Sequence, residues 1–144
     1  MLPVSRALGL DIGSRRIGVA LSDSAGTVAT PYEVVDRSGD RGHDHLRIAA
    51  LVDEAGADVV VVGVPLSLDG SIGPAAQAVL DEIDQLRGVL GAEIVTWDER
   101  LSTVEAQRSL RAGNVRKGKR RRVVDQVAAT VILQSWLDAG QPRG

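Results

Sequence analysis

ALGLDIGSRRIGVALSD, residues 7–23, is the stretch of sequence that decides the fold. Its first apolar run ends at Asp11, a turn follows, and a second apolar run begins at Ile17. This pattern predicts a β-hairpin with one carboxylate at its mouth. A carboxylate at the end of a buried strand is costly unless a positive charge offsets its desolvation, and a divalent cation would do so. Asp11 can also simply cap the turn, so this segment alone leaves both interpretations open.

The remaining sequence predicts an α/β domain with a mixed sheet. A third strand is expected over residues 27–35, with Pro31 at a sheet edge or a bulge. Further strands are expected at residues 59–64, which are apolar on both faces, and at residues 93–97. The helical periodicity predicts helices at about residues 44–55, 74–87, 104–111 and 123–137. Three hairpin-like strands followed by β-α units indicate a mixed five-stranded sheet with helices on its faces.

Composition narrows the class of protein. The 144 residues contain no obvious linker, so residues 1–144 are expected to form a single domain. The absence of cysteine excludes disulfides and thiolate metal sites. No secretory signal or membrane-spanning stretch is visible, so we expect a soluble cytoplasmic protein without a membrane partner. With no Phe and only three Trp and Tyr residues, nucleic-acid binding through stacked aromatic side chains is disfavoured.

Acidic residues stand at three positions where a sheet end could gather them. They are Asp11, Asp98 or Glu99 after the fifth strand, and Asp125 near the start of the last helix. Asp125 lies on the apolar face of that helix, which also carries Ala128, Ala129, Ile132 and Trp136. The alternatives are that Asp125 interacts with the helix dipole and that Asp98 and Glu99 are loop acids paired with Arg100.

If the three acids converge, their mutual repulsion requires metal ions. Oxygen ligands without His or Cys favour Mg²⁺ or Mn²⁺ over zinc. Two such ions about 4 Å apart are suited to in-line attack of water on a phosphodiester. The sequence therefore predicts hydrolytic chemistry on nucleic acid at this sheet end.

Basic residues cluster directly before Asp125. Such a run can hold a phosphate backbone next to the acids, although it can also be only a solvated loop. Additional positive charge at the hairpin mouth and after the fifth strand would extend the same rim. The candidate nucleic-acid contacts are Arg15, Arg16, Arg100, Arg116, Lys117, Lys119, Arg120, Arg121 and Arg122. His43 and His45 lack the spacing of a zinc site and are expected in a solvated helix entry.

Five blocks together resemble the signatures of the bacterial YqgF (RuvX-like) family. In chain order they are LGLDIG (8–13), VALSD (19–23), GVPL with DGS (63–66 and 69–71), DERLST (98–103) and DQVAA (125–129). They extend over residues 8–137, nearly the whole chain. The resemblance implies a ribonuclease H-like fold similar to the RuvC resolvase, with catalytic and metal-binding roles for Asp11, Glu99 and Asp125. The family is described both as a nuclease maturing the 5′ end of pre-16S ribosomal RNA and as a Holliday-junction resolvase.

The second acidic position requires a choice between two neighbours. Adjacent strand residues face opposite sides, so only one of Asp98 and Glu99 can readily join a metal cluster. We choose Glu99, because its side chain reaches further and related resolvases place a glutamate there, and keep Asp98 as the alternative metal ligand.

Two other classes of protein compete with a nuclease. Sugar kinases and actin-like ATPases resemble this chain in opening with an Asp-x-Gly turn, but they need two such domains to clamp a nucleotide. A non-catalytic RNA-binding ribosome-assembly factor would retain the fold and the basic run. Among nucleic-acid substrates, a symmetric four-way junction would favour a homodimer, whereas an RNA end needs only a monomer.

Overall fold

The computed structural model describes residues 6–102 and 117–143, and in the second range it describes side chains from residue 126 onward. The strands are β1 (Arg6–Ile12), β2 (Arg16–Ser22), β3 (Ala29–Asp36), β4 (Ala57–Val64) and β5 (Glu93–Asp98). The helices are α1 (Arg41–Ala55), α2 (Pro74–Leu86), the short 3₁₀ helix η1 (Glu99–Leu101) and α4 (Lys117–Asp138). The helix expected at residues 104–111 lies outside the described residues.

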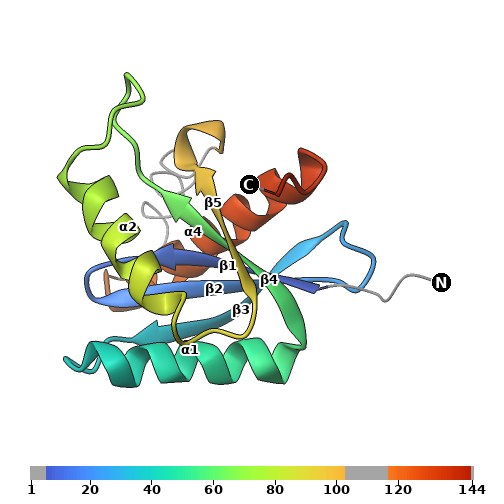
Figure 1. The fold of residues 1–144 in the computed structure, drawn as a ribbon, viewed down its shortest axis with the longest axis horizontal. Coiled ribbons are helices and arrows are strands. Elements are labelled where there is room, and N and C mark those ends of the chain that lie inside the picture. The colour runs from blue at the N-terminus through green and yellow to red at the C-terminus, as the bar shows by residue number, and fades with distance from the viewer. Residues whose placement is uncertain (1–5, 103–116, 144) are drawn as a thin grey trace.

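The strands form one mixed sheet in the order β3-β2-β1-β4-β5 (Figure 1). The β1-β2 and β2-β3 pairs are antiparallel, whereas β1-β4 and β4-β5 are parallel, which confirms the predicted mixed sheet. Strand β3 is an edge strand, and its register shifts so that Glu33 pairs with Val19 but Pro31 with Ala20. The prediction that Pro31 marks an edge or a bulge is therefore confirmed.

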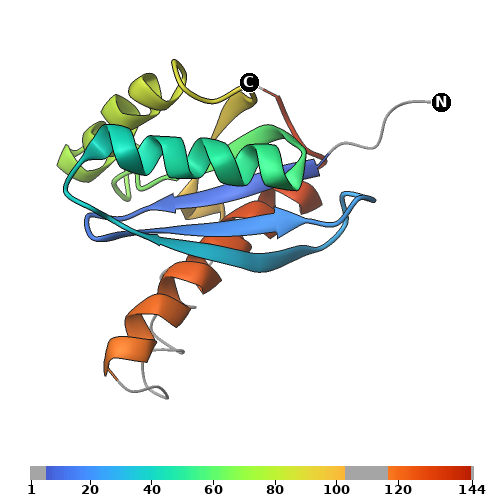
Figure 2. The same ribbon diagram turned by 90° about the horizontal axis from the view of Figure 1, so that it is seen from below.

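The helices cover both faces of the sheet (Figure 2), with α1 and α2 on one side and α4 on the other. Side chains alternate along β1, so Leu8 and Leu10 pack toward α1 and α2. Ala7 and Gly9 face α4, against Trp136 and Leu133, both of which are fully buried. Each face thus has its own apolar core.

Helix α4 begins at Lys117, earlier than the predicted start near residue 123. Lys and Arg are good helix formers, so a basic segment continues a helix readily even though it contains one glycine. Further along, the Trp97 indole donates to Ser135 Oγ at 3.1 Å, and Ser135 Oγ donates to the Leu101 carbonyl at 3.0 Å. These bonds attach the end of β5 and η1 to α4. No helix in the described part of the chain is long and apolar enough to cross a membrane.

Candidate active site

Asp11 is the penultimate residue of β1, and it lies on the face of the sheet that α4 covers. Leu10 is on the opposite face and pairs with Val62, so continuing this register by one residue places Asp11 beside Gly63 of β4. Its side chain is buried, with the residue only 5% exposed. The sequence prediction of an acid at the end of a buried strand is confirmed, and the carboxylate is largely withdrawn from water.

Asp98 and Glu99 point to different environments. The Arg100 guanidinium donates to both oxygens of Asp98 through Nε, at 3.1 and 3.0 Å, and Nη2 donates to Oδ2 at 2.7 Å. The Arg100 backbone N–H also donates to Asp98 Oδ1 at 2.9 Å. The pKa of Asp98 lies below its ordinary 3.8, mainly because the Arg100 side chain donates hydrogen bonds to the carboxylate. For Asp98, the structure therefore agrees with the alternative raised from the sequence, namely an acid that is paired with Arg100.

The Glu99 side chain lies over Gly63, on the same face of the sheet as Asp11. A Cβ added to Gly63 would come within 3.1 Å of Glu99 Cγ and 2.5 Å of Ile132 Cδ1. Glycine at this position therefore leaves the space that the side chains of Ile132 and Glu99 occupy over the sheet. Since β1, β4 and β5 are parallel, their carboxyl ends meet at one sheet edge, where Asp11 by its register and Glu99 by its contact both lie beside Gly63.

Asp125 belongs to α4, about one helical turn before Ala129. The Ala129 carbonyl oxygen would be 2.9 Å from a Cβ on Gly9, so α4 crosses β1 two residues before Asp11. The Asp125 side chain lies outside the described residues. Among the side chains that the structure describes, no group of three or more His, Cys, Asp and Glu could hold a metal ion. A three-carboxylate centre thus remains a prediction that depends on Asp125.

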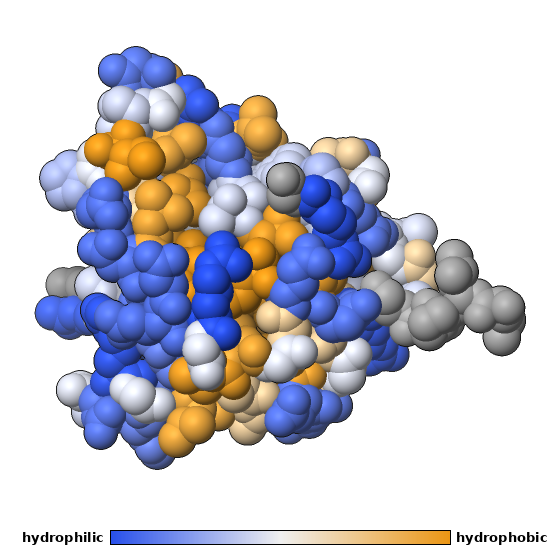
Figure 3. All heavy atoms as spheres, in the orientation of Figure 1, coloured by the Kyte–Doolittle hydropathy of each residue, from blue (hydrophilic) through white to orange (hydrophobic). Residues whose placement is uncertain are grey.

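The predicted basic rim is only partly described. Arg15 is exposed, whereas Arg16 Nε lies 3.3 Å from Asp36 Oδ1. Arg100 is held by Asp98, and its Nη1 also donates to the Leu68 carbonyl at 3.2 Å. Arg116 lies outside the described residues, and residues 117–122 have a helical backbone without described side chains. The loop that contains Leu68 also exposes Ile72, and apolar surface is visible in this part of the molecule in Figure 3.

The expectation of a solvated helix entry is wrong for His45, although His43 is exposed. His45 is 2% exposed, and its Nε2 lies 2.8 Å from Glu82 Oε2. It faces inward because it lies three and seven residues before Ile48 and Val52, on the buried side of α1. The same periodicity could have found Glu82, which lies among the buried residues of α2.

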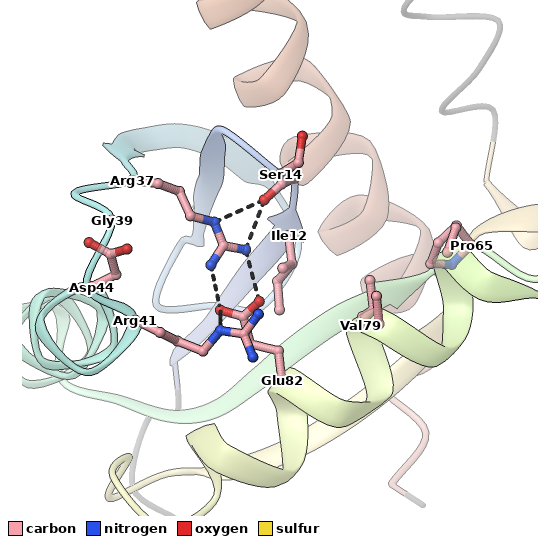
Figure 4. A pocket seen from close by; sticks show the side chains of 12 residues that line it. Ile12, Ser14, Arg37, Gly39, Arg41, Asp44, Pro65, Val79 and Glu82 are labelled. Carbon is pink, nitrogen blue, oxygen red and sulfur yellow. Dashed lines mark hydrogen bonds and ion pairs between the residues drawn. The ribbon is translucent and has the colours of Figure 1, made fainter.

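A pocket of about 540 Å³ adjoins this buried cluster, at the α1 and α2 side of the sheet end (Figure 4). The β1-β2 turn, the start of α1 and one side of α2 form its wall. Arg37 lies between the Glu82 carboxylate and the turn, where the figure shows its guanidinium making bonds in both directions. The lining residues are Ile12, Gly13, Ser14, Arg37, Gly39, Arg41, Asp44, Pro65, Ala75, Ala78, Val79 and Glu82.

Comparison with solved structures shows which known fold the chain shares. The chain aligns with RuvC of Thermus thermophilus in complex with a Holliday junction substrate, with a TM-score of 0.60. The alignment covers 96% of this chain and 98% of RuvC, at 14% sequence identity. The ribonuclease H-like fold implied by the sequence resemblance is therefore confirmed.

Comparison of sequences identifies the family. Proteins named "Putative pre-16S rRNA nuclease" include one from Desulforudis audaxviator, 45% identical over 93% of this chain and 94% of its own length. Another, from Mycolicibacterium paratuberculosis, is 53% identical over 92% of this chain and 80% of its own length. The model of the family described as "RuvX: Holliday junction resolvase" matches residues 5–139. The chain therefore belongs to the RuvX family, as its five sequence blocks indicated.

Proposed function

We propose that this protein is a divalent-metal-dependent endonuclease that cleaves phosphodiester bonds in structured nucleic acid. The observation that carries the proposal is the placement of Asp11 and Glu99 on one face of one sheet edge, under the helix that bears Asp125. Family membership supports the same reaction class.

The residues at this edge fit Mg²⁺ or Mn²⁺. Carboxylate oxygens are hard ligands, which these two ions prefer. The space above Gly63, which a Cβ would narrow, accommodates the Glu99 side chain, and the register of β1 with β4 places Asp11 beside the same glycine. We assign Asp11, Glu99 and Asp125 as the ligands, with Asp98 excluded by its pairing with Arg100.

Bound ions would supply an activated water and charge stabilisation for the leaving oxygen. The chain itself positions the carboxylates and shields Asp11 from bulk water. Asp11 is buried at the end of β1, between the sheet and α4, and Ser135 and Trp97 hold the η1 segment that carries Glu99. The basic start of α4 would bind phosphates beside the acids, because it lies on the same helix directly before Asp125.

The substrate that we propose is the 5′ region of pre-16S ribosomal RNA, in the cytoplasm. This assignment rests on the relatives that share 45–53% of their residues with the chain and carry that name. The description of the family model favours a second candidate, a four-way DNA junction. Symmetric cleavage of a junction would use a homodimer, whereas cleavage near an RNA end would not require one.

Purified protein should be incubated with pre-16S ribosomal RNA and with a synthetic four-way junction in the same Mn²⁺ buffer. We expect cleavage of the RNA near its mature 5′ end and little cleavage of the junction. The reverse preference would assign the second candidate. Binding without cleavage of either substrate, over a range of Mg²⁺ and Mn²⁺ concentrations, would favour a non-catalytic assembly factor.

Variants at the acids test the assigned ligands. Asp11→Asn, Glu99→Gln and Asp125→Asn should each nearly abolish cleavage while leaving nucleic-acid binding largely intact. The matched control is Asp98→Asn, which removes a neighbouring carboxylate and should retain most of the cleavage rate. Equal losses in Asp98→Asn and Glu99→Gln would refute our choice between these neighbours, and an unaffected Asp125→Asn would remove that residue from the site.

A further inference from the structure

Glu82 is a buried carboxylate on the apolar face of α2. It is 2% exposed and shares that face with Val79, Ile83 and Leu86, which pack against the sheet. An apolar residue would fill this position without the cost of desolvating a charge. A carboxylate on this face therefore needs partners, and it has them on two other elements.

Two side chains bind Glu82: Arg37, from the segment that joins β3 to α1, and His45, from α1 itself. Arg37 Nη1 and Nη2 donate to the two Glu82 oxygens, each at 2.8 Å, in a bidentate ion pair. His45 Nε2 lies 2.8 Å from Oε2, and Arg41 Nε approaches the same oxygen at 3.9 Å. The side chains of Glu82 and His45 are each 3% exposed, and that of Arg37 is 16% exposed. The group is thus largely withdrawn from water.

The same guanidinium reaches the turn that follows Asp11. Arg37 Nε and Nη2 donate to the Gly13 carbonyl at 3.0 and 2.8 Å, and the Arg37 backbone N–H donates to the Arg15 carbonyl at 2.9 Å. The turn is closed by the Gly13 N–H, which donates to the Arg16 carbonyl at 3.0 Å. A Cβ on Gly13 would lie 2.7 Å from that carbonyl oxygen, so the turn needs glycine there.

Net stability does not account for this arrangement. A buried ion pair often contributes little compared with apolar residues of similar volume, because desolvation offsets the attraction. The planar guanidinium of arginine instead contributes orientation, because it donates to two acceptor groups at once and so fixes their positions relative to each other. Here one acceptor belongs to α2 and the other to the backbone two residues after Asp11.

We propose that Arg37, oriented by Glu82 and His45, is a positioning residue that fixes the turn after Asp11 and thereby holds the Asp11 carboxylate for metal binding. This inference rests on the proposed function. It adds residues on the α1 and α2 side of the sheet to a site whose acids lie on the α4 side.

Two variants test the proposal. Arg37→Lys keeps the positive charge but loses the fork that binds Glu82 and Gly13 together. The double variant Arg37→Met with Glu82→Met removes both charges and should unfold at a temperature near that of the wild type. Both should raise the Mn²⁺ concentration for half-maximal cleavage by about tenfold or more, because partners behind metal ligands typically affect metal affinity by about 10–100-fold. Nucleic-acid affinity should change little.

The matched control is Asp44→Asn. Asp44 is buried beside the same pocket, but it accepts from the Ser38 N–H at the entry to α1 rather than holding the turn. This variant should lose stability yet keep the wild-type Mn²⁺ dependence. Folded Arg37→Lys and double variants whose half-maximal Mn²⁺ concentrations lie within about twofold of the wild type would overturn the proposal.

Hydrogen exchange separates this proposal from the proposed function. In metal-free protein, the amides of residues 12–18 should exchange faster in the two Arg37 variants than in Asp44→Asn. If the wild type neither binds Mn²⁺ nor cleaves, the proposed function fails, and unchanged exchange in this segment would separately refute the positioning role. If the double variant does not fold, Arg37→Lys still provides both the Mn²⁺ dependence of cleavage and the hydrogen exchange of residues 12–18.

Discussion

Replacing Gly9 with alanine tests how closely α4 must approach β1. The added Cβ would lie 2.7 Å from Leu133 Cβ and 2.9 Å from the Ala129 carbonyl oxygen. Ordinary contacts between carbon atoms are about 3.5–4.0 Å, so α4 has to move away by roughly one ångström. A change of rotamer cannot relieve these contacts, because both partners are backbone or Cβ atoms.

The expected cost follows from this geometry. Overpacking of a core costs about 1–3 kcal/mol, and the lower flexibility of alanine in the unfolded chain offsets about 0.4–1 kcal/mol. The free energy of unfolding should therefore fall by about 1–2 kcal/mol. For a chain of this size, the midpoint of thermal unfolding should drop by about 2–8 °C.

Urea and thermal unfolding of Gly9→Ala should be compared with those of Gly91→Ala. Gly91 has no neighbouring atom within 4 Å of an added Cβ, so its replacement should change stability by about 0.5 kcal/mol at most. Gly9→Ala should also lower the cleavage rate at temperatures where it is fully folded, because the displaced helix carries Asp125. Equal stability of the two variants would refute the close contact between α4 and β1.

Two further predictions concern charge. Burial raises the pKa of the Glu82 carboxyl, but the bonds from Arg37 and His45 outweigh it and hold the pKa below its ordinary 4.5. Its folded pKa therefore lies below the unfolded one, so its contribution to stability is present above about pH 4.5 and is lost as pH falls through the folded value. The stability difference between the wild type and Glu82→Gln, measured by urea unfolding, should shrink below about pH 4.5, and a constant difference would contradict the assignment. Neutralising Arg120, Arg121 and Arg122 together should flatten the slope of log affinity against log salt by about two to three units for RNA and DNA alike, and an unchanged slope would exclude these residues as phosphate contacts.

Local patterns predicted most of the fold because they depend on neighbours in sequence. Two apolar runs separated by a turn within residues 7–23 predict the hairpin, and the run at 59–64 predicts a strand covered on both faces. The predicted start of α4 near residue 123 is too late, because a run of like charges is also typical of a solvated loop before a helix. Propensity favours Lys and Arg in helices, and the structure extends α4 to Lys117.

The site was predictable only in part. Asp11 follows from its place at a strand end, but the choice between Asp98 and Glu99 depends on how the chain leaves β5. There it turns directly into η1, with Arg100 folding back on Asp98. The cluster of Arg37 and Glu82 joins residues that are 45 positions apart, and single-sequence periodicity shows only that Glu82 faces inward, not which cation it meets.

Glycines on one face of the central strands provide a signal that the acids alone do not. Gly9 and Gly63 lie on the α4 face of β1 and β4, whereas Leu8, Leu10 and Val62 fill the opposite face. Glycine weakens a strand, so a glycine in two neighbouring central strands on one face indicates close approach by another group. At Gly9 that group is α4, through Leu133 Cβ and the Ala129 carbonyl, and at Gly63 it is the side chains of Ile132 and Glu99. The glycines therefore bring the helix that bears Asp125 and the side chain of Glu99 to the same sheet edge as Asp11, which is the arrangement that a shared metal site would require.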